Sequence, residues 1–143
     1  MHIVFGGAFN GKRQYVKNLI QNEEASWHEG MMPQLILSDS ITVIAGVERW
    51  VKEQLEQGLT EQQIIERVKK TLGSSQSKQI WVLTDLNRGI VPTERIEREL
   101  RDLVGRLYQL LFTEAQQITR IWYGIPQTIK GADQDENLHK NRG

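Results

Sequence analysis

The sequence predicts an α/β fold built on a largely parallel sheet, and three observations support this. Short apolar runs rich in β-branched residues recur along the chain. They alternate with longer segments in which apolar residues return every three or four positions, as on one face of a helix. The first run leads into glycines, and the next two are followed by aspartates. Strands that alternate with helices usually pair in parallel, so we expect three layers, with helices on both faces of the sheet.

The first half of the chain is predicted to hold two strands and three helices. His2–Phe5 and Gln34–Ser38 are short, apolar and typical of strands buried on both faces. Thr60 and Gln63 fit a capping box that starts the third helix, and Gly58 ends the second. The remaining segments are a helix over Lys12–Gln21, a polar loop over Asn22–Pro33 and a helix over Ile41–Gln57.

The second half continues the alternation. Gln79–Thr84 is a third buried strand, separated from the preceding helix by a flexible turn. Pro92 and Thr93 introduce a long helix with a clear apolar stripe. The last predicted elements are a strand over Thr119–Gly124, a short edge strand over Ile125–Lys130 and a polar tail over Gly131–Gly143.

Length and composition restrict the function. The 143 residues suit one domain, taken here as residues 1–130, followed by the tail at 131–143. A formal net charge of zero argues against nucleic acid as the main partner, because phosphate backbones are bound through excess positive charge. The absence of cysteine excludes disulfides, thiolate metal sites and a cysteine nucleophile. We see no long apolar run and no leader pattern, so we expect a cytoplasmic protein without membrane contact.

A glycine-rich segment follows the first strand and opens the first helix. Its spacing, G-x-x-x-x-G-K, is that of a phosphate-binding loop. In such a loop the backbone N–H groups converge on a phosphate, the helix adds its positive end and the lysine adds a full charge. The alternative is a glycine turn that leaves the lysine in solvent. The residues predicted to bind nucleotide are Gly6, Gly7, Ala8, Phe9, Asn10, Gly11, Lys12 and Arg13.

Further candidates lie at the same edge of the predicted sheet. Asp39, after the second strand, is placed to hold Mg²⁺ and to act in catalysis with Lys12, or else to cap the next helix. Arg88, in the loop after the third strand, is a candidate phosphate clamp or a solvated loop arginine. Asp85 has the same geometry as Asp39 with a weaker case. Arg13 stands where such loops usually have a Ser or Thr that binds Mg²⁺, which a guanidinium cannot do.

Histidine and tryptophan give weaker signals. His28 lies in the predicted polar loop, where it could act as a nucleophile or general base, although a lone loop histidine more often does neither. Trp50, Trp81 and Trp122 fall within helix or strand patterns, and we interpret them as core or subunit-contact residues.

Several motifs match those of one known family. Gly89–Pro92 is the tetrapeptide GIVP, and Arg101–Gln109 in the helix after it follows R-D-x-x-G-x-x-N-Q, with Tyr108 in place of Asn. GGAFNGKR is similar to a GGARSGKS-like opening loop, and Asp39–Thr42 to an acidic residue, a small residue and I/L-T. Trp122–Lys130 is similar to a closing W-x-x-x-G-I/L-P-x-x-I-K segment. Over most of its length the chain thus resembles the bifunctional adenosylcobinamide kinase / adenosylcobinamide-phosphate guanylyltransferase family of cobalamin biosynthesis.

The resemblance implies a phosphate-binding-loop NTPase-like fold, ATP or GTP with Mg²⁺, cobinamide as substrate and a homo-oligomer, either a trimer or a dimer. It implies a kinase in which Lys12 stabilises the transferred charge, Asp39 holds Mg²⁺ and Arg88 orients phosphate. The family's guanylylated histidine lies in an H-x-x-R-R-like motif that this chain lacks, so we expect the guanylyltransferase activity to be lost. The alternative is a non-catalytic, nucleotide-binding or regulatory member, and low-specificity nucleotide hydrolysis is a weaker third reading.

Overall fold

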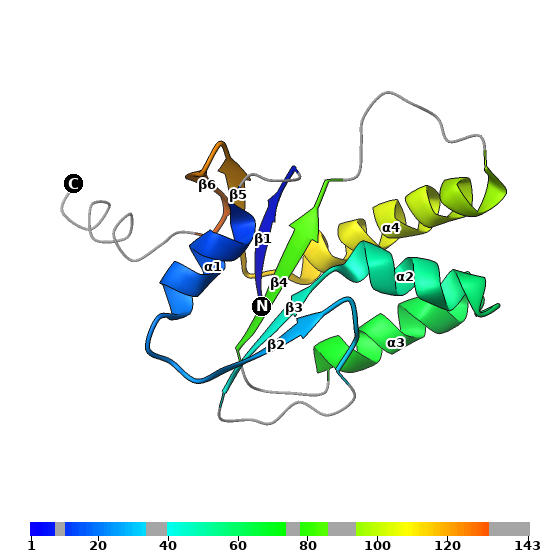
Figure 1. The fold of residues 1–143 in the computed structure, drawn as a ribbon, viewed down its shortest axis with the longest axis horizontal. Coiled ribbons are helices and arrows are strands. Elements are labelled where there is room, and N and C mark those ends of the chain that lie inside the picture. The colour runs from blue at the N-terminus through cyan, green and yellow to red at the C-terminus, as the bar shows by residue number, and fades with distance from the viewer. Residues whose placement is uncertain (8–10, 34–39, 74–77, 86–93, 132–143) are drawn as a thin grey trace.

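The computed structural model describes residues 1–7, 11–33, 40–73, 78–85 and 94–131. Within these ranges the chain forms four helices and one six-stranded sheet in the order β2-β3-β4-β1-β5-β6. Figure 1 shows α2, α3 and α4 lying side by side, with α1 well apart from them. The predicted α/β class with a mostly parallel sheet is confirmed, and it is consistent with the phosphate-binding-loop NTPase fold that the family resemblance implies.

Five strands of the sheet are parallel, and β1 (His2–Gly6) lies between β4 (Gln79–Thr84) and β5 (Gln117–Trp122). On the far side of β4 the sheet continues with β3 (Ile41–Ala45) and ends at β2 (Ala25–Glu29). The carboxyl ends of parallel strands meet at one edge of a sheet, and ligands of open α/β sheets bind there. The residues that directly follow β1, β2, β3 and β4 at this edge are Gly7, Gly30, Gly46 and Asp85.

The sheet separates two apolar clusters, because successive residues of a strand point to opposite faces. On one face α1 (Lys12–Ile20) packs through Val16. On the other face lie α2 (Val47–Glu56), α3 (Glu61–Gly73) and α4 (Arg95–Glu114), around the fully buried indole of Trp81. The α1 face buries eight residues, namely Val4, Val16, Ile41, Val43, Ala45, Ile80, Val82 and Ile121.

Most of the elements predicted from the sequence are confirmed. The first and third predicted strands are β1 and β4, and the long helix is α4. The capping box is present, since the Thr60 amide donates to Gln63 Oε1 at 2.9 Å and the Gln63 amide donates to Thr60 Oγ1 at 3.2 Å. The predicted edge strand is β6 (Ile125–Lys130), which pairs antiparallel with β5.

Two predictions between α1 and α2 are wrong. Residues 41–45 were expected to start a helix but form the buried strand β3, and α2 begins only at Val47, after Gly46 in a left-handed conformation (φ 69°). The expected polar loop contains β2, an edge strand with mostly exposed residues and therefore no apolar run to reveal it. The predicted strand over Gln34–Ser38 lies outside the described residues, as do residues 132–143 of the predicted tail.

Candidate phosphate-binding site

The glycine-rich segment joins β1 to α1 at the carboxyl edge of the sheet. Gly6 is the last residue of β1, and a Cβ there would lie 2.5 Å from the carbonyl oxygen of Ile121 on β5, so only glycine fits without displacing the backbone. Gly11 precedes α1 with φ 83°, a left-handed conformation that glycine adopts readily. Ala8, Phe9 and Asn10 lie outside the described residues.

Lys12 does not extend into solvent. Only 3% of its surface is exposed, and its Nζ donates to the carbonyl oxygen of Gly7 at 2.5 Å, which ties the start of α1 to the end of β1. Burial lowers the pKa of the Lys12 ammonium, the neighbouring Arg13 charge lowers it further and Glu48 opposes both. The predicted alternative of a solvent lysine is therefore wrong, and the ammonium is held beside the loop.

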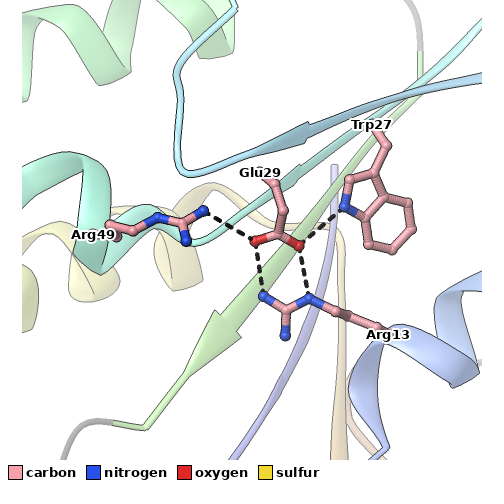
Figure 2. A network of polar contacts seen from close by, with 4 residues as sticks. All are labelled: Arg13, Trp27, Glu29 and Arg49. Atoms are coloured by element: carbon pink, nitrogen blue, oxygen red, sulfur yellow. Dashed lines mark hydrogen bonds and ion pairs between the residues drawn. The ribbon is translucent and has the colours of Figure 1, made fainter.

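Glu29 is the centre of a polar network that joins α1, β2 and α2 (Figure 2). Arg13 Nε and Nη2 donate to Glu29 Oε1 and Oε2 at 2.7 and 2.9 Å, a bidentate pair. Trp27 Nε1 donates to Glu29 Oε1 at 3.1 Å, and Arg49 Nη2 lies 3.8 Å from Glu29 Oε2. Hydrogen bonding by Arg13 is the main cause that lowers the pKa of the Glu29 carboxyl, and the same bond raises the pKa of Arg13.

Two glycines leave the space that this network occupies. A Cβ on Gly30, which follows Glu29, would collide with the Arg49 guanidinium. A Cβ on Gly46 would lie 2.8 Å from the Gly30 amide nitrogen and 3.0 Å from Glu29 Oε2. Both glycines have φ 69°, so the backbone and the side chains both favour glycine at these two strand ends.

A second carboxylate, Glu48, lies in the first turn of α2. Its Oε2 is buried, and it has no hydrogen-bond partner in the described part of the chain. Its negative charge raises the pKa of Lys12 and Arg13, which places it within electrostatic reach of both cations. Burial raises the pKa of the Tyr108 hydroxyl on α4, and the negative charge of Glu48 raises it further. This hydroxyl donates to the carbonyl oxygen of Thr84 at 2.8 Å.

The sequence predicted some members of this site and missed others. Of the predicted residues, the structure brings together Gly6, Gly7, Gly11, Lys12 and Arg13. The carboxylates that it places beside them were not predicted and come from β2 and α2. A signal for one was present, because Gly46 directly follows the apolar, β-branched run ITVIA and marks a strand end just before Glu48.

Asp39 and Arg88 lie outside the described residues, so their predicted roles stay predictions. The premise for Asp39 does change. Observed strand β3 begins two residues after Asp39, at Ile41, and its carboxyl end is Ala45. Asp85 directly follows β4, and its amide donates to the Gly6 carbonyl oxygen at 2.9 Å. His28 lies within β2, paired with Ile44, rather than in a loop.

The family model described as cobinamide kinase / cobinamide phosphate guanyltransferase matches residues 23–129, about three quarters of the chain. The chain belongs to this family. Its members are nucleotide-using transferases that act on cobinamide and its phosphate in cobalamin biosynthesis. A comparison with curated proteins finds no match. None of the helices in the described ranges combines the length and apolar character that a bilayer crossing demands.

The matched region begins after α1, so it includes Glu29, Glu48 and Asp85 but not the glycine loop or Lys12. The case for phosphate binding at the loop therefore depends on local geometry: a strand, a left-handed glycine, a buried lysine and the start of a helix. This is the arrangement that favours an anion at the amino end of a helix.

The residues described at the loop do not fit the magnesium ion that the loop motif and the family imply. The position whose hydroxyl binds the metal in other loops is Arg13, a cation paired with Glu29. Both Glu29 oxygens already face cationic or N–H donors. The described residues hold no group of three metal-ligating side chains, and the unpartnered oxygen of Glu48 lies within reach of two cations.

Proposed function

We propose that this member of the cobinamide kinase family binds ATP or GTP at Gly6–Arg13 and transfers the γ-phosphoryl group to the aminopropanol hydroxyl of cobinamide. The observation that carries the proposal is the buried Lys12 ammonium, held at the Gly7 carbonyl at the amino end of α1. A phosphate that enters the loop would replace this carbonyl as the partner of the ammonium. Phosphoryl transfer needs mainly positioning and charge stabilisation, which such a lysine supplies.

In the proposed reaction the hydroxyl oxygen of cobinamide forms a bond to the γ-phosphorus as the bond to the β–γ bridging oxygen breaks. The hydroxyl releases its proton to solvent, and the nucleoside diphosphate leaves. Lys12 would balance the negative charge on the transferred group, and the backbone N–H groups of the loop would hold the phosphates. Arg88 as a phosphate clamp remains part of the proposal on the strength of the family resemblance alone, whereas Asp39 as a ligand of Mg²⁺ stays a prediction from the sequence and carries no step of it.

We also propose that the guanylyltransferase activity is lost. The H-x-x-R-R-like motif of the guanylylated histidine is missing from the sequence. His28, in the middle of β2, pairs with Ile44 and is half-buried, which is a poor position for a nucleophile that must reach a nucleotide. Incubation with α-labelled GTP should leave no acid-labile label on the protein, and label that disappears in His28→Asn would contradict the proposal.

The kinase proposal is tested by nucleotide titration together with a phosphorylation assay on cobinamide. Lys12→Met should weaken ATP or GTP binding about 100-fold, since it removes a charged partner of the phosphates. Lys17→Met, on an exposed position of the same helix, is the matched control and should bind like the wild type. Equal affinity in all three proteins would show that the nucleotide does not bind here.

One observation favours a second candidate, a non-catalytic nucleotide-binding or regulatory member. Arg13 replaces the hydroxyl residue that helps to bind the metal of the transfer step, and Glu29 holds its side chain. Nucleotide binding without phosphorylation of cobinamide would support this candidate and exclude the kinase.

We further propose that the chain assembles as a homodimer or trimer and works in the cytoplasm. Apolar and aromatic side chains on the β5–β6 hairpin support a contact surface, since Trp122, Tyr123, Ile125 and Ile129 are all more than half exposed. Of the other tryptophans in helix or strand patterns, Trp50 and Trp81 are buried in the core. Light scattering after gel filtration measures the mass, and a monomer at micromolar concentration would contradict the assembly.

A further inference from the structure

We propose that the nucleotide phosphates bind to this site without a divalent cation, because the Arg13 guanidinium, held in place by Glu29, supplies the positive charge. The inference rests on the proposed function and extends it to the form of the nucleotide that is bound. It follows from the misfit between the implied magnesium ion and the residues described at the loop. Arg13 is then a phosphate-binding residue and Glu29 a positioning residue.

The Arg13 guanidinium has donors left for a phosphate. A guanidinium carries five N–H donors, and Glu29 accepts one from Nε and one from Nη2. The other three N–H groups, two of them on Nη1, have no partner among the described residues. The Arg13 side chain is 44% exposed, so the guanidinium is accessible to solvent and to a ligand. Arginine is well suited to this role because its planar fork matches phosphate oxygens.

Glu29 is built to hold a guanidinium rather than a metal ion. Trp27 Nε1 donates to Oε1 at 3.1 Å, and Arg49 faces Oε2 at 3.8 Å, so the carboxylate is contacted from two sides in addition to Arg13. Gly30 and Gly46 leave the space for both side chains.

The simplest alternative is that Arg13 and Glu29 form only a surface ion pair. Such pairs contribute little to the free energy of unfolding. The chain offers a control for this alternative. Arg95 and Glu99 form an exposed pair in the first turns of α4, with Nε 2.9 Å from Oε1, and α4 packs on the face of the sheet opposite to α1 (Figure 1). Changes in that pair should have no effect on nucleotide binding.

The test is isothermal titration of ATP and of GTP into the full chain, once in excess magnesium and once in excess EDTA. The wild type should bind with dissociation constants that agree within about threefold between the two buffers. Arg13→Ser restores the usual hydroxyl, so its affinity in EDTA should fall about tenfold or more and recover in magnesium. Glu29→Gln should weaken binding in both buffers, and Arg95→Ser should match the wild type.

Different failures have different meanings. A wild type that binds about tenfold or more tightly in magnesium than in EDTA overturns the inference and leaves the nucleotide site intact. Equal affinity of Arg13→Ser and the wild type in EDTA also overturns it. Arg13→Lys, which keeps the charge and loses the fork, guards against a folding defect in the serine variant, and it should retain part of the affinity in EDTA. No binding of either nucleotide in any buffer contradicts the proposed function itself.

Discussion

The two faces of the sheet differ in the size of the apolar cluster that they bury and in the helices that cover them. On one face three helices bury the larger cluster, in which Trp81, Leu83 and Leu107 have almost no exposed surface. On the other face α1 alone packs over the smaller cluster, and its first two residues are Lys12 and Arg13. The carboxylates that α1 meets, Glu29 and Glu48, lie at the carboxyl ends of the strands or just beyond them. Most of the buried apolar surface therefore lies away from the charged groups of the proposed nucleotide site.

Because the two faces of the sheet differ in this way, stability and ligand binding should respond to different substitutions. The polar groups of the site are fixed by ion pairs and glycine backbones, and the three-helix face is fixed by apolar packing. Three substitutions test this separation, from the largest expected effect to the smallest.

Leu107→Ala should destabilise the protein by about 3 kcal/mol, since it leaves a cavity in the middle of α4. Nucleotide affinity measured on the folded variant should be unchanged. Urea unfolding gives the free energy, and Leu19→Ala on α1, a leucine that is 48% exposed, is the matched control with an expected loss of about 0.5 kcal/mol or less. A loss of affinity in Leu107→Ala would show that the two faces are coupled.

Gly46→Ala should break the separation, because it changes both properties. Its left-handed backbone and the 2.8 Å approach of a Cβ to the Gly30 amide should together cost about 2 to 3 kcal/mol. The shift of Glu29 should also weaken nucleotide binding. Gly58→Ala is the control, since Gly58 has φ 89° but no described atom within 4 Å of the added Cβ, and it should cost only about 1 kcal/mol without a change in affinity.

The pH dependence of stability tests the amino end of β1, opposite the end at which the glycine-rich segment begins. Burial, helped by the charge of the chain's amino terminus, lowers the pKa of His2 from 6.5 to about 4. The unfolded chain therefore binds a proton that the folded chain refuses between pH 6.5 and 4, and stability falls as pH falls through this window. After allowance for the partial exposure of the ring, the loss should be about 2 kcal/mol.

The His2→Gln variant should lose this part of the slope when urea unfolding of the two proteins is compared across the window. Nucleotide affinity at neutral pH should not change, because His2 bonds to Thr119 Oγ1 at 2.8 Å and lies at the amino end of β1. An identical pH slope in both proteins would show that His2 titrates normally in the folded state.

The predicted elements that held were those whose sequence signal is local. β1 and β4 are short apolar runs bounded by polar or glycine residues, and Thr60 with Gln63 makes a cap within one turn. β3 was misread because Ile44 and Val47 happen to fall at helical spacing with Val51, although Ile44 belongs to the strand and Val47 begins the helix. Gly46 between them was the local evidence for the boundary.

The candidate site was predictable only where the motif is contiguous. Lys12 follows from its spacing to the glycines, and its burial is new information from the fold. Glu29 could not be found from the sequence, because it reaches Arg13 only after β2 joins the sheet beside β3. The contact between Glu29 and Arg13 depends on strand pairing between distant segments. β2 itself has no apolar pattern from which it could have been predicted.

The hydrogen bond from Trp27 to Glu29 also allows the site to be followed by tryptophan fluorescence. An indole whose N–H is bound to a carboxylate emits in an environment that changes when that carboxylate moves. Trp50 and Trp81 are buried, and Trp122 is half exposed, so a Trp122→Phe protein would retain Trp27 as its one partly exposed tryptophan. Its emission would then follow the position of Glu29, and with it the state of the arginine that Glu29 holds, in real time and without a labelled nucleotide.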